Sequence, residues 1–350
     1  MSRKIIRVGI VGLRFGAKVH GPAFGRVEDC RVVAVAGREH GDIAVAESLV
    51  PGTTGFAGWR QMLDGVDLDA IAIAVPPVAQ AAIATEAATR GIAVFCEKPA
   101  AVDVSGAEAM LHAVTTNRVT HAINFLFPEI PAWIAAKQAV DEMASVHPLR
   151  HAALTWRIET YAHRHSLKDS WKRSAHNGGG ALNGFVAHSV YYLEWLFGPI
   201  GRVLAKLSPA DEIDDSRVDA WIEFRSGMSA SLSVAIDCPF GTGHRLEVYG
   251  HDGVVILDNP SADYASGFQL TRRSRSQSPD SAPLDMNVAV SVDGRIQATS
   301  KIAGRFVLHL RSGGLPTPNL SHGLRVQRLM DVFRNSHRSQ SWMDAPHAGV

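Results

Sequence analysis

The stretch that decides the fold is GIAVFCEKP at residues 91–99. Its apolar part, 92–95, follows a glycine and predicts a strand that is buried on both faces. Pro99 has no backbone N–H to donate, so Glu97 and Lys98 should lie where the strand ends. In an open parallel sheet, ligands bind beyond the carboxyl ends of the strands. Partial desolvation there would favour the neutral amine of Lys98, which can exchange a proton with a substrate hydroxyl.

An isolated Glu-Lys-Pro would be interpreted as a solvated surface pair, and the surrounding pattern reverses that interpretation. Strands are predicted at 5–11, 31–36, 70–75 and 120–125, and helices at 42–49, 56–63, 79–90 and 104–116. Strands that alternate with helices at this spacing indicate right-handed βαβ units and a parallel sheet. We therefore predict an α/β fold whose first domain, residues 1–123, is a Rossmann dinucleotide-binding domain.

A glycine turn after the first predicted strand carries part of a dinucleotide fingerprint. In G-x-G-x-x-G/A, Gly12 fits the first position and Ala17 the third, but Arg14 stands at the second. Glycine at that second position lets the backbone approach the pyrophosphate, so Arg14 either turns outward and pairs with a phosphate or occludes the site. We predict that the cofactor contacts Gly12, Arg14, Phe15, Gly16 and Ala17.

The end of the second predicted strand bears on the choice of dinucleotide. An acidic residue there holds the ribose 2′-hydroxyl of NAD, whereas an arginine accommodates the 2′-phosphate of NADP. Arg38 stands at this point, and Glu39 comes only after it. We therefore expect NADP(H) to be the preferred cofactor, with NAD(H) as the other candidate. A solvated arginine at a strand end is the alternative interpretation.

The pattern changes after the strand that ends near Asn124, so residues 124–350 are predicted to form a second domain. Strands are expected at 149–160, 203–208, 218–224, 229–238, 244–249 and 254–257, and helices at 132–143 and 324–335. Strands in series without intervening helices indicate an antiparallel sheet. The polar segment 272–297 is expected to be a loop with one strand near 288–292.

A triple glycine at 178–180 leads into a predicted helix that carries His188 and ends at Phe197. The glycines can form a flexible loop of close approach. Gly184 and His188 are spaced i, i+4 and should share one helical face. A histidine in this position can exchange a proton with a bound hydroxyl, and a structural core histidine is the alternative.

Composition limits the classes of partner and compartment. The chain has 350 residues, of which 46% are hydrophobic and 20% charged, as in ordinary globular proteins. Lys and Arg (35) balance Asp and Glu (34), so no nucleic-acid partner is expected. Three widely spaced cysteines favour a reducing compartment, and no apolar run reaches the roughly 18 residues of a membrane span. We expect a cytoplasmic protein that acts on a small molecule.

Metal-dependent hydrolysis is a further hypothesis, since the chain contains 16 histidines. His163 and His165 alternate along an extended stretch without an acidic or cysteine partner at ligand spacing. A G-x-S-x-G motif, which would indicate a nucleophilic serine, is also missing from the sequence. No metal site is therefore predicted.

Four sequence blocks together resemble the glucose–fructose oxidoreductase / inositol dehydrogenase / MocA (Gfo/Idh/MocA) family. In chain order the blocks are 11–17, 74–77, 96–99 and 178–188, and the resemblance covers nearly the whole chain. It implies a Rossmann domain followed by an α/β domain with a large, mostly antiparallel sheet that mediates homodimers or homotetramers. It also implies hydride transfer between NAD(P) and a secondary alcohol of a sugar or sugar derivative, including nucleotide-linked sugars.

The resemblance also implies roles for individual residues. Lys98 would accept or donate the proton of the reacting hydroxyl, and His188 would assist. Further contacts with the cofactor would come from Val75, Pro76, Pro77, Glu97 and Lys98. Contacts with the substrate would come from Asn124, Trp171, Lys172, Asn183 and His188, and specificity from loops at 161–176 and 240–245.

Three positions depart from the family pattern. Arg14 replaces the second glycine, Gly184 stands where many members carry an aspartate, and Pro128 stands where relatives often have an arginine. Asn183 lies beside Gly184, although one residue rotates it about 100° around the helix. These departures support a second hypothesis, in which the chain has lost catalysis and acts as a ligand sensor or regulatory protein.

Overall fold

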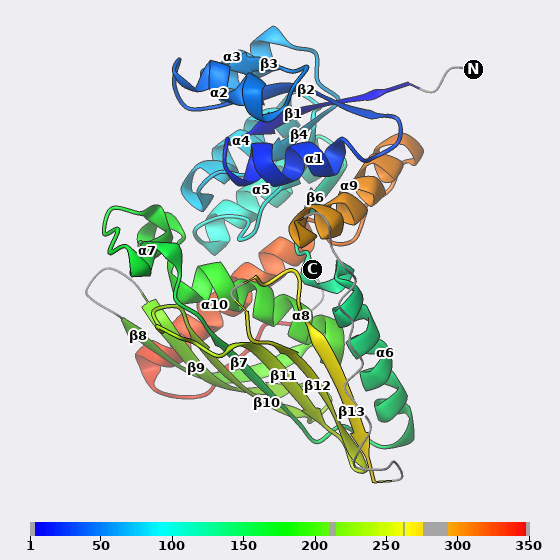
Figure 1. The fold of residues 1–350 in the computed structure, drawn as a ribbon, viewed down its shortest axis with the longest axis vertical. Helices are drawn as coiled ribbons and strands as arrows, with labels where there is room; N and C mark the ends of the chain where they lie inside the picture. Colours follow the sequence, from blue (N-terminus) through cyan, green and yellow to red (C-terminus); the bar gives the residue numbers. More distant parts are fainter. Residues whose placement is uncertain (1–3, 210–214, 262, 276–292, 348–350) are drawn as a thin grey trace. The chain divides into compact units, whose positions relative to one another are not determined.

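A computed structural model describes residues 4–209, 215–261, 263–275 and 293–347 (Figure 1). The chain forms two compact units, each built from two segments. Unit 1 comprises Met1–Leu126 and Gly294–Gln327, and unit 2 comprises Phe127–Asp293 and Arg328–Val350. The predicted division assigned everything from residue 124 onward to the second domain. The structure differs because the segment Gly294–Gln327 packs in unit 1.

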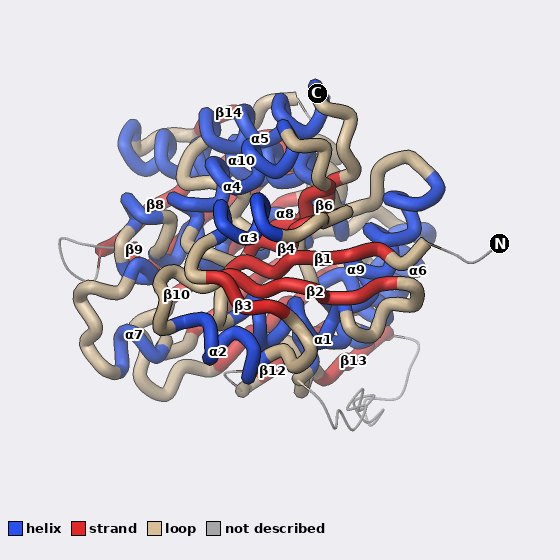
Figure 2. The backbone as a smooth tube through the Cα atoms, turned by 90° about the horizontal axis from the view of Figure 1, so that it is seen from above, coloured by secondary structure: helices blue, strands red, loops and turns tan. Residues whose placement is uncertain are grey.

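A six-stranded parallel sheet forms the centre of unit 1, in the order β3-β2-β1-β4-β5-β6. The strands are β1 (Ile6–Val11), β2 (Cys30–Ala36), β3 (Thr54–Phe56), β4 (Ala70–Ile73), β5 (Ala93–Cys96) and β6 (His121–Ile123). Every residue of β4 and β5 is buried, as their continuous apolar sequence predicts. Figure 2 shows β1 between β2 and β4, where the strand order reverses. Dinucleotides bind at this reversal in doubly wound folds.

The helices of unit 1 include five that connect these strands, α1 to α5, and two that follow much later in the chain. They are α1 (Gly21–Phe24), α2 (Asp42–Leu49), α3 (Trp59–Gly65), α4 (Pro77–Thr89), α5 (Val104–Thr116), α9 (Gly294–Ser312) and the first part of α10 (Leu320–Ser339). A π-helical turn, Gly16–His20, precedes α1. Helix α4 begins on Pro77, where a missing N–H costs nothing, and Asp103 caps α5 by accepting from the backbone N–H of Gly106 at 2.8 Å.

Helix α9 explains why the second segment belongs to unit 1. Phe306 packs edge-on against Phe24 and Phe95, with ring centroids 6.3 and 5.7 Å away, and Ile302 is fully buried in the same core. The sequence predicted a loop over 272–297, whereas α9 begins at Gly294. Residues 288–292, for which a strand was expected, lie outside the described part of the chain.

An eight-stranded mixed sheet dominates unit 2, in the order β13-β12-β11-β7-β10-β9-β8-β14. The strands are β7 (His151–Arg157), β8 (Ile200–Pro209), β9 (Asp215–Phe224), β10 (Ser229–Ala235), β11 (Gly243–Tyr249), β12 (Gly253–Asn259), β13 (Gln269–Ser274) and β14 (Met343–Asp344). The pair β7–β10 is parallel and the other neighbours are antiparallel. The predicted fold class, a Rossmann domain plus a mostly antiparallel α/β domain, is confirmed.

Helices cover one face of this sheet (Figure 1). They are α6 (Pro131–Val146), α8 (Ala187–Phe197) and the second part of α10, and α6 packs on β12 and β13. Short helical segments lie at Phe127–Glu129, Tyr161–Arg164, Trp171–Arg173, Ala175–Asn177 and Leu182–Val186. Along β9, Val218 and Ile222 are buried, whereas Arg217, Asp219 and Trp221 are exposed. The sheet therefore has one covered and one exposed face.

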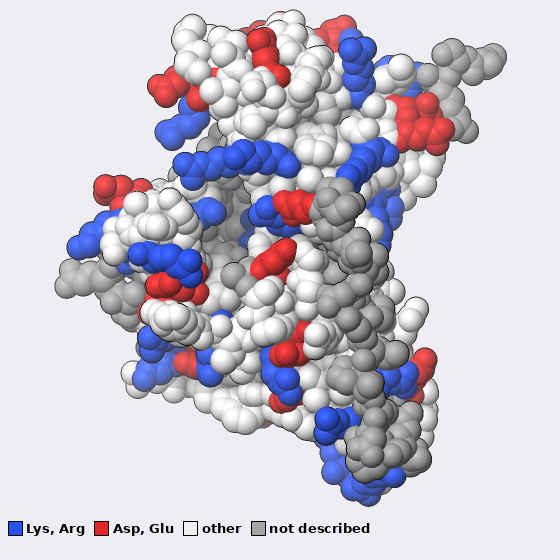
Figure 3. All heavy atoms as spheres, in the orientation of Figure 1, with Lys and Arg blue, Asp and Glu red and all other residues white. Residues whose placement is uncertain are grey.

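Two features of the surface bear on partners. Acidic and basic side chains are interspersed over the visible face of each unit (Figure 3), in line with the balanced composition. Within the described residues, helices of the length and apolar character that a bilayer requires are lacking.

Candidate active site

The carboxyl end of β5 carries Glu97 and Lys98, as predicted, and both are half-buried. The Lys98–Pro99 peptide is cis. Gln80, a fully buried residue of α4, spans this segment. Its Nε2 donates to the backbone oxygens of Glu97 and Pro99 at 3.1 and 2.7 Å, and its Oε1 accepts from the N–H of Glu97 at 3.2 Å. Gln80 therefore clamps the backbone that carries Lys98.

Two buried side chains meet the carboxylate of Glu97. Nε2 of His20 lies 2.8 Å from Oε1, and Nδ2 of Asn124 donates to the same oxygen at 2.7 Å. Asn124 also donates to Oγ1 of Thr299 in α9 at 3.1 Å. Because buried polar groups need partners, this network fixes the carboxylate next to Lys98. The amide nitrogen of Asn124 belongs to this network, and the substrate contact that the sequence predicted for Asn124 stays a prediction.

His20 is, with Gln80 and Thr299, one of the residues of this site that sequence reasoning missed. It ends the π-helical turn after the glycine motif and packs edge-on against Phe15 and Phe95, with ring centroids 5.4 and 5.1 Å away. One sequence signal could have revealed it. His20 comes three residues after Ala17 and four before Phe24, so a helix would place it on an apolar, buried face.

The glycine turn after β1 has the shape that a diphosphate requires. Gly12 has φ +112°, and a Cβ added there would lie 2.3 Å from the backbone oxygen of Ala74, so only glycine fits. Val75 lies beside it at the end of β4. Gly16 is buried at the start of the π-helical turn, whereas Arg14 is exposed, which favours the outward of the two predicted orientations. This turn at the strand reversal therefore fits a dinucleotide.

The remaining cofactor residues lie at neighbouring strand ends of unit 1. Arg38 is exposed after β2, and its backbone N–H donates to Oδ2 of Asp42 at 2.6 Å. Pro76 follows β4 and Pro77 begins α4, while Phe15 and Ala17 belong to the turn after β1. The structure thus brings the predicted cofactor residues to the carboxyl ends of β1, β2, β4 and β5.

In unit 2, the triple glycine packs closely against another segment of the predicted substrate site. A Cβ added to Gly179 would lie 2.3 Å from the backbone oxygen of Trp171. Gly180 has φ +85°, and a Cβ there would lie 1.7 Å from Oδ1 of Asp215. The predicted close approach is therefore present, and it fixes the loop next to half-buried Trp171 and exposed Lys172.

His188 lies in the first turn of α8 and is only 5% exposed. Phe127 packs edge-on against its ring with centroids 5.0 Å apart, and the rings of Tyr264 and Trp156 lie 6.3 and 6.4 Å away. The imidazole is therefore surrounded by aromatic rings, which restrict its orientation.

A second buried histidine belongs to the same cluster. His244 stacks on Trp156 with centroids 4.3 Å apart, and its Nε2 lies 3.0 Å from the hydroxyl of Tyr192, which donates to Ser189 at 3.0 Å. Burial lowers the pKa of His244 to about 3 and raises the pKa of Tyr192. Both groups are therefore neutral at physiological pH. Sequence reasoning did not single out either of them.

Asn183 is a buried residue of unit 2. Its side chain is 1% exposed, its Nδ2 donates to the backbone oxygen of Gly179 at 3.0 Å, and its Oδ1 accepts from Arg334 at 2.7 Å. The sequence predicted a substrate contact. That contact stays a prediction, while both ends of the amide bond within unit 2 and fix the glycine loop.

Comparisons with known proteins identify the family of the chain. The Gfo/Idh/MocA oxidoreductase family matches with its NAD-binding Rossmann fold at residues 6–125 and with its C-terminal α/β domain at 152–344. Levoglucosan dehydrogenase of Pseudarthrobacter phenanthrenivorans is 24% identical over 97% of this chain and 98% of that protein. Inositol 2-dehydrogenase of Rhizobium meliloti is 26% identical over 76% of this chain and 81% of that protein.

A solved structure of levoglucosan dehydrogenase in complex with NADH and levoglucosan has the same fold. The two structures align with a TM-score of 0.85 at 22% identity, over 98% of this chain and 100% of the other. The predicted family is confirmed by the two domain matches, which together cover most of the sequence. The chain belongs to the Gfo/Idh/MocA family of NAD-binding oxidoreductases.

Proposed function

We propose that this enzyme transfers a hydride between a nicotinamide dinucleotide and a secondary alcohol carbon of a sugar or sugar derivative. The observation that carries the proposal is Lys98 at a strand end that Gln80 and the Glu97 network fix in place. This strand end belongs to the same parallel sheet as the glycine turn at Gly12. Relatives named levoglucosan dehydrogenase and inositol 2-dehydrogenase support a polyhydroxylated substrate.

In the oxidative direction, the neutral amine of Lys98 accepts the hydroxyl proton while the carbon loses a hydride. In the reductive direction, the ammonium returns that proton. The nicotinamide, when bound, supplies the hydride acceptor or donor. His188 forms a hydrogen bond with the same hydroxyl, and its aromatic neighbours restrict the angle of that bond. Trp171 and Lys172 contact other parts of the sugar.

Lys98→Met tests this assignment. Removing the proton acceptor should lower kcat by about 10²–10⁴-fold. NAD(P)H binding, followed by cofactor fluorescence, should change little, because the glycine turn remains. Lys4→Met, at an exposed lysine that pairs with Asp69, is the control and should keep full activity. The substrate panel should include levoglucosan, inositols and nucleotide-linked sugars.

The panel also separates catalysis from the ligand-sensor hypothesis. If neither NADH nor NADPH binds at millimolar concentration, the proposed function is wrong. If a dinucleotide binds, no sugar is turned over, and Lys98→Met leaves the cellular function unchanged, the protein is a sensor rather than an enzyme acting through Lys98.

We further propose that NADP(H) is the preferred cofactor, with Arg38 at the 2′-phosphate. A charge-assisted hydrogen bond contributes about 1.5–3 kcal/mol, so Arg38→Ala should raise KM for NADPH by about 10- to 100-fold. KM for NADH should stay near the wild-type value, because NADH has no 2′-phosphate. Equal KM values for NADPH in both proteins would exclude this role for Arg38.

The exposed face of the eight-stranded sheet supports a homo-oligomer. Trp221 is 53% exposed on this face, next to His151, whose ring centroid lies 5.8 Å away. A large exposed aromatic residue on an extended sheet is typical of an interface core. Light scattering after size exclusion should give a dimer or tetramer, and Trp221→Lys should shift the mass toward the monomer.

A further inference from the structure

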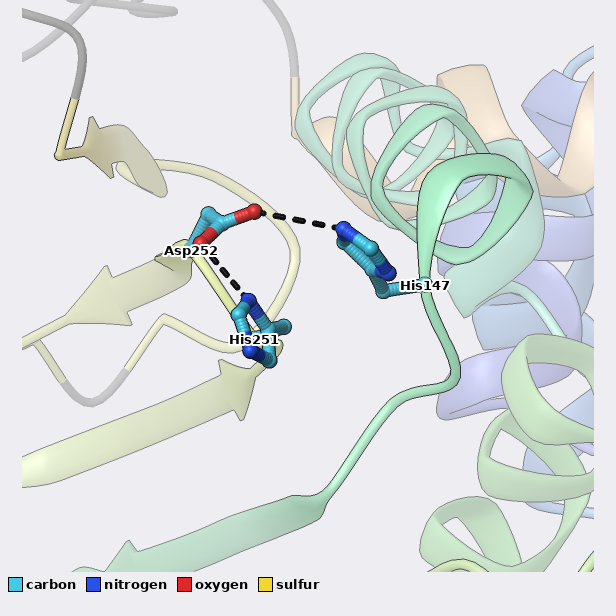
Figure 4. Close-up of side chains that lie close together, drawn as sticks. All are labelled: His147, His251 and Asp252. Carbon is cyan, nitrogen blue, oxygen red and sulfur yellow. Dashed lines mark hydrogen bonds and ion pairs between the residues drawn. The ribbon is translucent and has the colours of Figure 1, made fainter.

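Two imidazoles and a carboxylate come together at one end of the sheet in unit 2 (Figure 4). His147 directly follows the last residue of α6, and His251 and Asp252 lie in the turn between β11 and β12. Figure 4 shows both rings next to the Asp252 carboxylate. Sequence spacing did not reveal this group, because His147 is far from the other two in the chain.

The geometry of the cluster is close to that of a coordination site. Oδ1 of Asp252 lies 2.7 Å from Nδ1 of His251, and Oδ2 lies 3.5 Å from Nε2 of His147. One ligand atom from each residue can be chosen so that all three lie within 4.8 Å of one another. A tetrahedral ion with bonds of about 2.0–2.2 Å places its ligand atoms about 3.3–3.6 Å apart. The two nitrogen–oxygen distances, 2.7 and 3.5 Å, lie near that spacing.

The chemistry of the three groups selects one class of ion. We propose that His147, His251 and Asp252 bind a divalent transition-metal ion such as Zn²⁺. Imidazole nitrogen is a common ligand of Zn²⁺, Cu²⁺ and Ni²⁺, whereas Mg²⁺ and Ca²⁺ prefer oxygen ligands. Two neutral imidazoles and one carboxylate carry a single negative charge, which partly neutralises the ion.

The surroundings are compatible with a bound ion. The three residues line a cavity of about 770 Å³, which leaves room for water on the ion. Glu142 lines the same cavity, but its carboxylate pairs with Arg272 at 2.7 Å. We therefore do not include Glu142 among the proposed ligands, which are His147, His251 and Asp252.

A bound ion would join the end of α6 to the β11–β12 turn and stabilise unit 2. The same three side chains could also associate through protons alone, with imidazolium rings paired to Asp252. Metal binding by the full-length protein distinguishes these two cases, and it requires neither a dinucleotide nor a sugar. Its outcome is therefore independent of the proposed function.

The test is a titration of chelator-treated protein with Co²⁺, followed by its visible absorption, and then with Zn²⁺ by calorimetry. Wild type should bind one more ion per chain than the double variant His147→Ala/His251→Ala. Loss of a residue that only supports a metal ligand typically lowers metal affinity by about 10- to 100-fold. Asp252→Asn alters a ligand itself, so it should lower the affinity for the ion by at least this factor. His112→Ala, which removes an exposed histidine of α5, is the control.

Thermal unfolding gives a second readout. Saturating Zn²⁺ should raise the Tm of wild type and of His112→Ala, because an ion that binds only the folded state stabilises it. The Tm of the double variant should not change. The proposal is overturned if the double variant binds the same number of ions with wild-type affinity, or if Zn²⁺ shifts the Tm of both proteins equally.

Discussion

The strand end at Lys98 and the helix start at His188 hold their side chains in different ways. Hydrogen bonds fix the segment of Lys98, since Gln80 bonds its backbone and Glu97 accepts from two buried side chains. Aromatic rings such as Phe127 fix the side chain of His188 by packing against it. Hydrogen bonds fix a direction, whereas rings exclude water and restrict a plane. Substitutions should therefore act through lost hydrogen bonds in unit 1 and through desolvation and steric fit in unit 2.

The largest expected effect concerns desolvation in unit 2. Burial lowers the pKa of His244 to about 3, compared with about 6.5 in an unfolded chain. Between these pH values the unfolded state binds the extra proton, so stability that is fully present above pH 6.5 is lost as the pH falls toward 3. His244→Gln has no imidazole to protonate. When the pH falls from about 7 to about 4.5, its free energy of unfolding should therefore decrease by on the order of 3 kcal/mol less than that of wild type.

Urea unfolding at the two pH values measures this difference. His112→Gln, at an exposed position, is the matched control and should follow the wild-type dependence on pH. If wild type and His244→Gln lose equal stability on acidification, the imidazole at 244 is not kept neutral by burial.

The next effect tests steric fit at the glycine loop. Gly180→Ala introduces a Cβ at φ +85° and forces Asp215 away from the backbone N–H of Leu182, to which its Oδ2 is bonded at 3.0 Å. Backbone strain and the lost hydrogen bond should together lower the free energy of unfolding by about 2–4 kcal/mol. Denaturant unfolding measures the change. A variant as stable as wild type would show that the loop relaxes without cost.

A smaller effect is expected for the hydrogen bond of His20 in unit 1. His20→Phe keeps a ring against Phe95 but cannot bond the carboxylate of Glu97, so it should lose about 1–3 kcal/mol of stability. It should also lower kcat with little change in KM, because Glu97 and then Lys98 lose their fixed position. His20→Gln restores a donor amide and should recover part of kcat. If Phe and Gln variants have equal kcat, His20 only fills space.

The sequence predicted what depends on local pattern, and it missed what depends on distant segments. The alternation of apolar runs, glycines and prolines predicted the parallel sheet and the strand end at Lys98, and the fold class is confirmed. The hydrogen bonds of His20 with Glu97 and of Asn124 with Thr299 join helical segments to strand ends that are far away in the chain, and no local spacing marks them. Likewise, the polar residues before and at the start of α9 led to the prediction of a loop, although the helix has an apolar face that includes Phe306.

The smallest effect is expected at Gly184, which offers a contrast with Gly180. Among the described residues, no heavy atom beyond the chain neighbours and the local helical backbone lies within 4 Å of a Cβ added at Gly184. Glycine inside a helical segment is unfavourable relative to alanine by about 0.5–1 kcal/mol, so Gly184→Ala should raise the free energy of unfolding by roughly this amount. The same substitution four residues apart should thus have opposite signs.

Gly184→Asp then uses the same open position to probe His188. A carboxylate one helical turn before an imidazole favours its protonated form, so the pH profile of kcat should move to higher pH if His188 gains or loses a proton in the reaction. Gly184→Ala is the control and should keep the wild-type profile with wild-type kcat. Identical profiles in all three proteins would mean that His188 orients the substrate without changing its protonation state, and Lys98 alone would handle the proton.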